Sequence, residues 1–118
     1  MANVNPSFSI AKALIRSFIL YSCLKKPKSG YALLAQGKNI LLTNWSAGSF
    51  YPHLSFLLDQ KLLLRKKTGS NRITYEYSTT RLGIEYLNHI SSYFKNSVLK
   101  EFFGALILGD FNERITKS

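Results

Sequence analysis

Apolar residues recur every three or four positions over the first half of the chain, which is the period of a helix that buries one face. This spacing predicts a helix over Ile10–Leu24, which is terminated by Pro27 and Gly30. It also predicts a second, short helix over Tyr31–Gln36, with Gly37 as its stop. The first half of the chain is therefore expected to be helical.

A third helix is predicted to end near Gln60, with an apolar stripe that begins at Phe50. Pro52 limits where this helix can begin, because proline lacks an N–H and is harmless only in the first turn. We therefore expect the helix to begin near Gly48 or Ser49.

The pattern changes to short β-type segments after the third helix. Leu62–Lys67 and Arg72–Ser78 predict the two strands of a hairpin, joined by a turn rich in Gly, Ser and Asn. Thr79 or Thr80 is expected to cap one long final helix, whose apolar stripe continues to about Leu108.

This order of elements defines the expected fold class, which is α+β, mainly α: a winged helix-turn-helix with a long C-terminal dimerisation helix. In such a fold the third helix enters the major groove of DNA and the hairpin is the wing. We expect residues 1–81 to form the winged-helix DNA-binding domain and residues 82–118 to form the dimerisation helix and tail.

Charge separates the same two parts. Sixteen Lys and Arg residues against six Asp and Glu residues give a formal net charge of +10. Basic and acidic residues are equal in number over residues 82–118, so the whole excess lies in residues 1–81. An excess of this size is typical of proteins that bind DNA, RNA or an anionic membrane surface.

Several classes of protein are disfavoured. Six acidic residues and two histidines offer no paired carboxylates, no nucleophile with a base, and no zinc-binding spacing, so we expect neither an enzyme nor a cofactor or metal. The apolar run Phe102–Leu108 is too short to span a bilayer, and we expect no membrane partner. Cys23 is the single cysteine and is interpreted as a core residue of a cytoplasmic protein.

Three stretches resemble the PadR-like transcriptional regulators. Ser29–Tyr31 resembles the Gly-Tyr pair that opens the second helix in that family. Ser46–Leu54 resembles the family's Ser-Pro-Gly-Thr-Leu-Tyr-Pro-x-Leu stretch. Tyr77, Thr80 and Gly83 match the Tyr-x-Leu-Thr-x-x-Gly that leaves the wing. The tail resembles that of the short family members, which have a single C-terminal helix.

The chain also departs from the family pattern at three positions. Lys61 stands where the family has the glycine that ends the recognition helix. Ala47 replaces a proline, and Thr79 replaces a leucine. These departures leave the fold expectation unchanged but weaken any inference about a sensed ligand.

The resemblance implies a sequence-specific regulator of transcription that binds double-stranded DNA as a homodimer, with repression as the expected effect. The neutral tail independently favours a dimer, because a long helix with a wide apolar stripe must bury that stripe. A small-molecule effector at the dimer interface is left open. The predicted interface residues are Leu87, Ile90, Phe94, Val98 and Phe102.

The candidate DNA-binding residues gather at the beginnings of the second and third helices and on the wing. The serines can contact phosphates or only cap helices, and Tyr51 can reach a phosphate or pack into the core. His53 is predicted to lie on the outward face of the third helix. The full set is Lys26, Lys28, Ser29, Tyr31, Ser46, Gly48, Ser49, Tyr51, His53, Lys66, Lys67 and Arg72.

Two other functions remain open. A winged-helix adaptor could use the basic face to bind an acidic protein, and an architectural protein could bind DNA without sequence preference. Weak or unselective binding to duplex DNA would favour these alternatives over a sequence-specific regulator.

Overall fold

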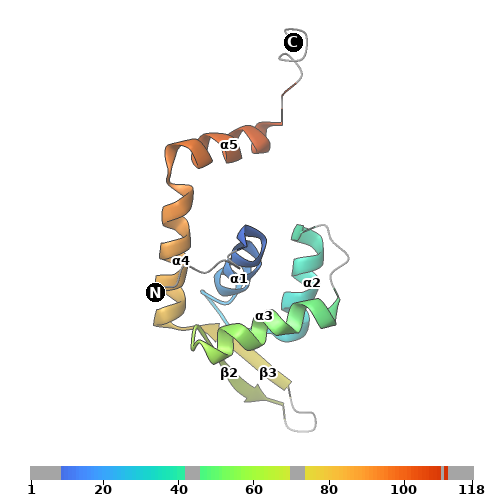
Figure 1. The fold of residues 1–118 in the computed structure, drawn as a ribbon. Coiled ribbons are helices and arrows are strands. Elements are labelled where there is room, and N and C mark those ends of the chain that lie inside the picture. Colours follow the sequence, from blue (N-terminus) through green and yellow to red (C-terminus); the bar gives the residue numbers. More distant parts are fainter. Residues whose placement is uncertain (1–8, 42–45, 70–73, 110, 112–118) are drawn as a thin grey trace. The chain divides into compact units, whose positions relative to one another are not determined.

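A computed structural model describes residues 9–41, 46–69, 74–109 and 111, and confirms an α+β winged helix-turn-helix (Figure 1). The chain divides into two compact units, Met1–Leu87 and Asn88–Ser118, and the boundary between them lies within the helix Arg81–Phe94. The elements are α1 (Ile10–Ser22), β1 (Lys28–Ser29), α2 (Gly30–Leu41), α3 (Ala47–Asp59), β2 (Leu63–Thr68), β3 (Thr74–Thr79), α4 (Arg81–Phe94) and α5 (Ser97–Leu108).

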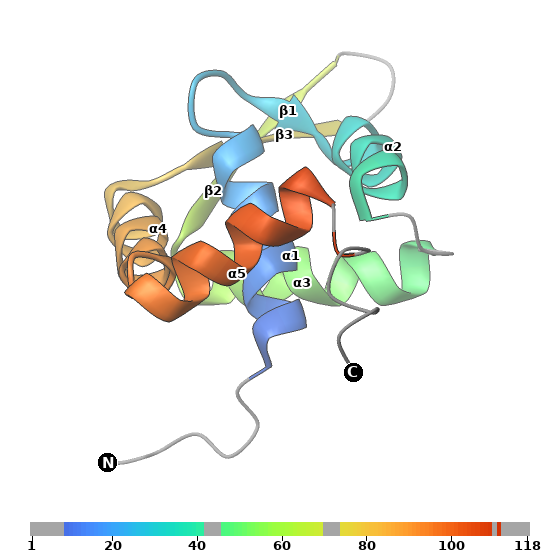
Figure 2. The same ribbon diagram turned by 90° about the horizontal axis from the view of Figure 1, so that it is seen from above.

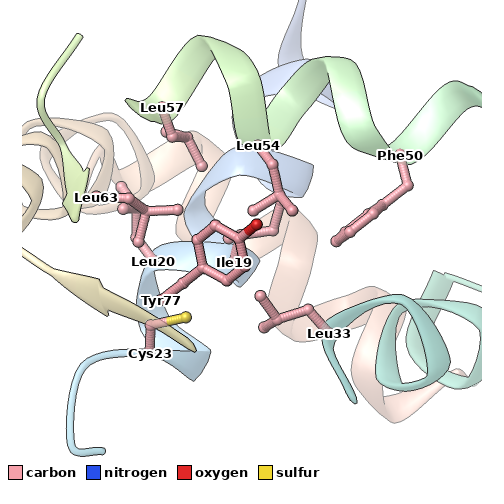
Figure 3. Packing of buried hydrophobic residues seen from close by; sticks show 9 residues of the cluster. All are labelled: Ile19, Leu20, Cys23, Leu33, Phe50, Leu54, Leu57, Leu63 and Tyr77. Atoms are coloured by element: carbon pink, nitrogen blue, oxygen red, sulfur yellow. The ribbon is translucent and has the colours of Figure 1, made fainter. Parts of the chain in front are cut away.

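The core of the first unit forms where α1, α2, α3 and the sheet meet (Figure 3). Burying one large aliphatic or aromatic side chain stabilises a fold by about 1.5–3 kcal/mol. This core therefore fixes the position of α3 relative to the sheet. Its buried residues are Ile19, Leu20, Cys23, Leu33, Phe50, Leu54, Leu57, Leu63 and Tyr77.

The sheet contains a strand that the sequence did not predict. Among the described residues the strand order is β1-β3-β2, and both pairs are antiparallel. Lys28 pairs with Tyr77 and Ser29 with Glu76. Figure 2 shows β1 beside β3 and leading directly into α2. A strand of two residues is too short to show an alternation of apolar and polar positions in the sequence. β1 is recognised only by its pairing with β3.

The second helix is longer than predicted. Ser29 caps it, because its Oγ accepts a hydrogen bond from the Ala32 N–H at 3.1 Å. The prediction that Gly37 ends this helix is wrong, because Gly37 is buried inside a helix that continues to Leu41. A glycine weakens a helix interior by about 1 kcal/mol, which tertiary packing outweighs here.

The third helix begins at Ala47, slightly earlier than predicted. Ser46 and Ser49 form a capping box that holds this beginning in place. Pro52 therefore lies past the first turn, and the carbonyl of Gly48 receives no hydrogen bond from residue 52.

A Schellman motif ends α3. The Leu62 N–H donates to the Leu57 carbonyl at 2.8 Å, and the Lys61 N–H donates to the Leu58 carbonyl at 3.0 Å. Lys61 adopts a φ of 61°, the left-handed conformation that favours glycine. This is the position at which Lys61 replaces the glycine of the PadR-like pattern.

Replacing Lys61 with glycine is expected to raise the free energy of unfolding by about 1 kcal/mol, because a Cβ is unfavourable at this φ. Urea denaturation of both proteins measures the change. Lys61→Ala is the control, since it removes the amino group and keeps the Cβ. An equal gain from alanine would show that the charge of Lys61, and not its backbone, is the unfavourable feature.

Two threonines join the wing to the helices around it. The Thr79 hydroxyl donates to the Leu20 carbonyl at 2.6 Å, and the Thr79 N–H donates to the Cys23 carbonyl at 3.3 Å. Thr80 caps α4, as predicted, by accepting from the Gly83 N–H at 3.1 Å. Its own N–H donates to the Leu62 carbonyl at 3.1 Å, and its hydroxyl donates to the Lys61 carbonyl at 2.7 Å.

The prediction of one long C-terminal helix is wrong. The tail contains α4 and α5, separated at Lys95 and Asn96. The Asn96 side chain caps α5 by accepting from the N–H groups of Val98 and Leu99, at 3.0 and 3.5 Å. The rings of Phe94 and Phe103 pack edge to face across this break, with centroids 5.0 Å apart. The spacing of apolar residues continues unchanged from α4 into α5, so the hydrophobic pattern alone predicts one continuous helix.

Candidate nucleic-acid interface

The exposed beginning of α3 is the first part of the candidate site. The Ser46 N–H donates to Ser49 Oγ and the Ser49 N–H donates to Ser46 Oγ, both at 3.3 Å. The two hydroxyl oxygens lie 3.0 Å apart. Both predicted serines therefore serve as helix caps, while their side chains remain exposed. Capping does not prevent a hydroxyl from also accepting or donating toward a ligand.

Gly48 lies exposed between these serines. A Cβ built there would meet only Ser46 Oγ, at 3.7 Å, which is ordinary contact. Gly48 also has no positive φ. The fold therefore does not require glycine at this position, in contrast to Gly83, where a Cβ would lie 2.4 Å from the Leu62 carbonyl oxygen.

Tyr51 lies where α3 approaches the beginning of α2. Its ring packs edge to face against Phe50, with centroids 5.2 Å apart, yet 42% of the residue is exposed. A Cβ at Gly30 would lie 3.6 Å from atoms of both Tyr51 and Tyr77. Tyr51 therefore packs through its ring and keeps an accessible surface, while its contact with a phosphate stays a prediction.

Basic residues of the wing lie on two different faces of β2. Leu63 is buried and Leu64 is exposed, so alternation places Arg65 and Lys67 on the same face as Leu63. Lys66 lies on the other face, opposite Glu76. The two predicted lysines thus point away from each other, and Arg72 lies outside the described residues.

Arg65 is a wing residue that the predicted set left out. Its Cζ lies 4.2 Å from the centroid of the Tyr75 ring. Burial raises the pKa of Tyr77, and the positive charge of the Arg65 guanidinium lowers it in part. The Tyr77 hydroxyl therefore stays protonated at neutral pH. Strand alternation was the sequence signal that could have separated Arg65 and Lys67 from Lys66.

The remaining predicted contacts surround the beginning of α2. Tyr31 is 79% exposed and Lys26 is exposed, whereas Lys28 is half-buried in β1. Lys26 and Lys28 also line a groove of about 460 Å³ beside α1 and α2. Burial raises the pKa of the nearby Cys23 thiol to about 11, so this cysteine is an unreactive core residue.

His53 does not lie on the outward face, contrary to the prediction. It is half-buried, and its Nδ1 accepts a hydrogen bond from Arg16 Nε of α1 at 3.3 Å. The Arg16 guanidinium also lies 3.7 Å from the centroid of the Phe56 ring. Arg16 therefore joins α1 to the face of α3 that turns toward it. A single histidine among apolar helix positions gave no sequence signal for this partner.

The free energy of unfolding is expected to fall as the pH is lowered through the ordinary histidine pKa of 6.5. Burial is the main cause that lowers the pKa of His53, and the positive charges of Arg16 and Lys12 lower this pKa further. The unfolded chain therefore binds this proton more tightly than the folded chain, so acid favours unfolding and the loss is complete below the folded-state pKa. Thermal melts over this pH range measure the effect.

His53→Asn is the matched control, because an amide oxygen can accept the Arg16 hydrogen bond without titrating. The variant should lose the part of the pH dependence that His53 contributes. An unchanged profile would show that His53 does not cause the dependence.

The five predicted interface residues of the tail differ in exposure. Leu87 is half-buried and packs against the core of the first unit, Ile90 is buried, and Phe94 is half-buried. Val98 and Phe102 are 71% and 54% exposed. Together with the exposed Leu106 they form a stripe along α5, at a spacing of four residues.

The fold defines the class of the protein as a winged helix-turn-helix, in which α2 and α3 form the helix-turn-helix and β2 and β3 form the wing. None of its described helices combines the length and apolar character that crossing a membrane requires. No protein-family model matches the sequence, and no curated protein matches it. Solved structures, however, match it over most of its length.

A PadR-like transcription factor from Bacteroides fragilis matches with a TM-score of 0.66 and 20% identity, over 82% of this chain and 93% of that chain. A PadR family transcriptional regulator from Eggerthella lenta matches with a TM-score of 0.65 and 22% identity, over 86% and 88%. Bacillus subtilis PadR in complex with operator DNA matches with a TM-score of 0.55 and 28% identity, over 64% of this chain and 46% of that chain. The chain has the fold of these transcription regulators, and its predicted resemblance to them is confirmed in the fold.

Proposed function

We propose that this chain is a transcription regulator that binds double-stranded DNA. The observation that carries the proposal is the exposed N-terminal end of α3, the helix that a winged helix-turn-helix inserts into the major groove. Charge supports it, since no acidic residue precedes Asp59 and the net charge is +10. The similar Bacillus subtilis PadR is itself bound to operator DNA.

The proposed contact surface combines three elements. The beginning of α3 would meet base edges and phosphates, while the beginning of α2 and the wing would meet the backbone on either side. DNA contacts of His53, Lys66 and Arg72 stay predictions, because the first two lie on other faces and the third is not described. The proposed residues are Lys26, Lys28, Ser29, Tyr31, Ser46, Gly48, Ser49, Tyr51 and Lys67.

We further propose that the regulator is a homodimer and acts as a repressor in the cytoplasm, with residues 1–81 binding DNA and residues 82–118 holding the dimer. The exposed apolar stripe of α5 supports the dimer. No described residue of α5 is fully buried, and the stripe consists of Val98, Phe102 and Leu106. The same stripe on a second copy of the chain could bury these apolar side chains.

Selection from a random-duplex pool, followed by titration of the selected duplex against a scrambled one at two salt concentrations, tests the function. We expect a palindromic site that is bound on the order of a thousandfold more tightly than the scramble. Equal binding to both duplexes, with a steep loss in salt, would instead identify an architectural protein. Negligible binding to either would favour an adaptor for an acidic protein.

Gly48→Ala is expected to weaken DNA binding without weakening the fold. The free protein has room for the new methyl group, and alanine is favoured over glycine within a helix by up to about 1 kcal/mol. The methyl group would, however, occupy the space in which DNA approaches the helix. Affinity for the selected duplex and a thermal melt together measure the two effects.

Gly104→Ala is the matched control, because Gly104 lies in α5 and a Cβ there meets nothing within 4 Å. It should stabilise to a similar extent and leave DNA affinity unchanged. Equal DNA affinity of the Gly48 and Gly104 variants would remove Gly48 from the contact surface.

A further inference from the structure

Arg65 is held against the wing by two aromatic residues of the neighbouring strand. Its Cζ lies 4.2 Å from the centroid of the Tyr75 ring, and Arg65 pairs directly with Tyr77 across the sheet. A guanidinium stacked on a ring engages it through its flat face. The N–H groups that point outward from its edge remain available for a second partner.

The surroundings of Arg65 favour an anionic partner. Glu76 is the only acidic residue of β2 and β3, and it pairs with Lys66 on the other face of the wing. Lys67 lies on the same face as Arg65, one pleat further along the strand. No carboxylate of the wing therefore competes for the Arg65 guanidinium.

The strand partner of Arg65 lies close to the beginning of α2 and to a residue of α3. Arg65 pairs across the sheet with Tyr77. The Tyr77 ring and the Tyr51 hydroxyl both lie 3.6 Å from a Cβ built on Gly30. An anion held by Arg65 would thus lie on the side of the wing that faces the proposed recognition helix.

We propose that Arg65, positioned by Tyr75, binds a backbone phosphate of duplex DNA. This inference rests on the proposed function and names one binding residue of it. A planar guanidinium with two parallel N–H groups matches a phosphate in a two-pronged geometry. The aromatic ring fixes the plane before DNA arrives, so little side-chain entropy is lost on binding.

Binding of wild-type protein and variants to one fixed duplex, over a series of salt concentrations, tests the proposal. Arg65→Gln should reduce the slope of log affinity against log salt by about one unit per protomer. Arg65→Lys keeps the charge and should keep the slope, while affinity falls about two- to fivefold because stacking is lost. Tyr75→Leu should reproduce the result of Arg65→Lys, since it keeps apolar bulk and removes the ring face.

The double variant separates positioning from a general structural role. If Tyr75 acts through Arg65, the Arg65→Lys and Tyr75→Leu changes combined should weaken binding no more than either one alone. Lys100→Gln in α5 is the control for loss of one exposed positive charge, and it should leave the slope unchanged. Thermal melts of each variant identify any loss of folded protein.

Two results would overturn the proposal. One is an Arg65→Gln slope equal to that of wild type, and the other is additive losses in the double variant. Either result would leave the proposed function intact as long as wild-type protein binds the duplex. Absence of wild-type binding to any duplex would remove the proposed function itself.

Discussion

Gly83→Ala is expected to destabilise the protein by about 3 kcal/mol, because the new methyl group has no space. A Cβ there would lie 2.4 Å from the Leu62 carbonyl oxygen and 2.6 Å from Thr79 Cγ2. Neither atom can yield easily. The Leu62 carbonyl accepts a hydrogen bond from the Thr80 N–H, and the Thr79 hydroxyl donates to the Leu20 carbonyl. Gly83 therefore maintains the close approach of α4 to the end of α3.

A thermal melt measures this effect, and a fall in Tm of about 10 °C or more is expected. The Gly104→Ala variant is again the control, since it makes the same substitution where there is open space. A Gly83→Ala protein as stable as wild type would mean that α4 can shift away from the wing without loss.

Phe102→Asp is expected to weaken the proposed dimer about 30-fold or more, the effect of removing a central interface residue. The substitution also places a charge in an apolar contact, which adds to the loss. Phe102 lies at the middle of the stripe formed with Val98 and Leu106, and 54% of it is exposed. Sedimentation at micromolar concentration should show dimers for wild type and monomers for the variant.

DNA binding should fall with the dimer. Two linked recognition helices bind one palindrome more tightly than either alone, by a factor of about a hundred or more. Lys100→Asp is the matched control, because it introduces the same carboxylate on a different face of α5. A wild-type protein that is monomeric, or a Phe102→Asp protein that remains dimeric, would contradict this role of α5.

The winged helix could be predicted from sequence because its elements are long and regular. The predicted apolar stripe of α3 corresponds directly to the buried residues Phe50, Leu54 and Leu57. Thr80 was recognisable as a cap because a threonine immediately before an apolar helical pattern has few other roles. Such features depend on residues close together in the chain.

Other features depend on residues that are distant in sequence. The Arg16 contact with His53 joins two helices, and no spacing in either helix indicates it. The break between α4 and α5 has a local signal, the Asn96 cap, but the apolar period of four runs across it and favours one continuous helix. The left-handed backbone conformation of Lys61 could be suspected from sequence only because the PadR-like pattern has glycine at that position.

The hydrogen bond from Thr79 to Leu20 can form only after most of the first unit has been synthesised. These residues are 59 positions apart, so the end of α1 gains this partner only after β3 has left the ribosome. The elements that complete the core of the first unit are all made before α5. A newly made chain can therefore close its first unit before the apolar stripe of α5 emerges, which limits the time in which that stripe is exposed beside an unfolded core.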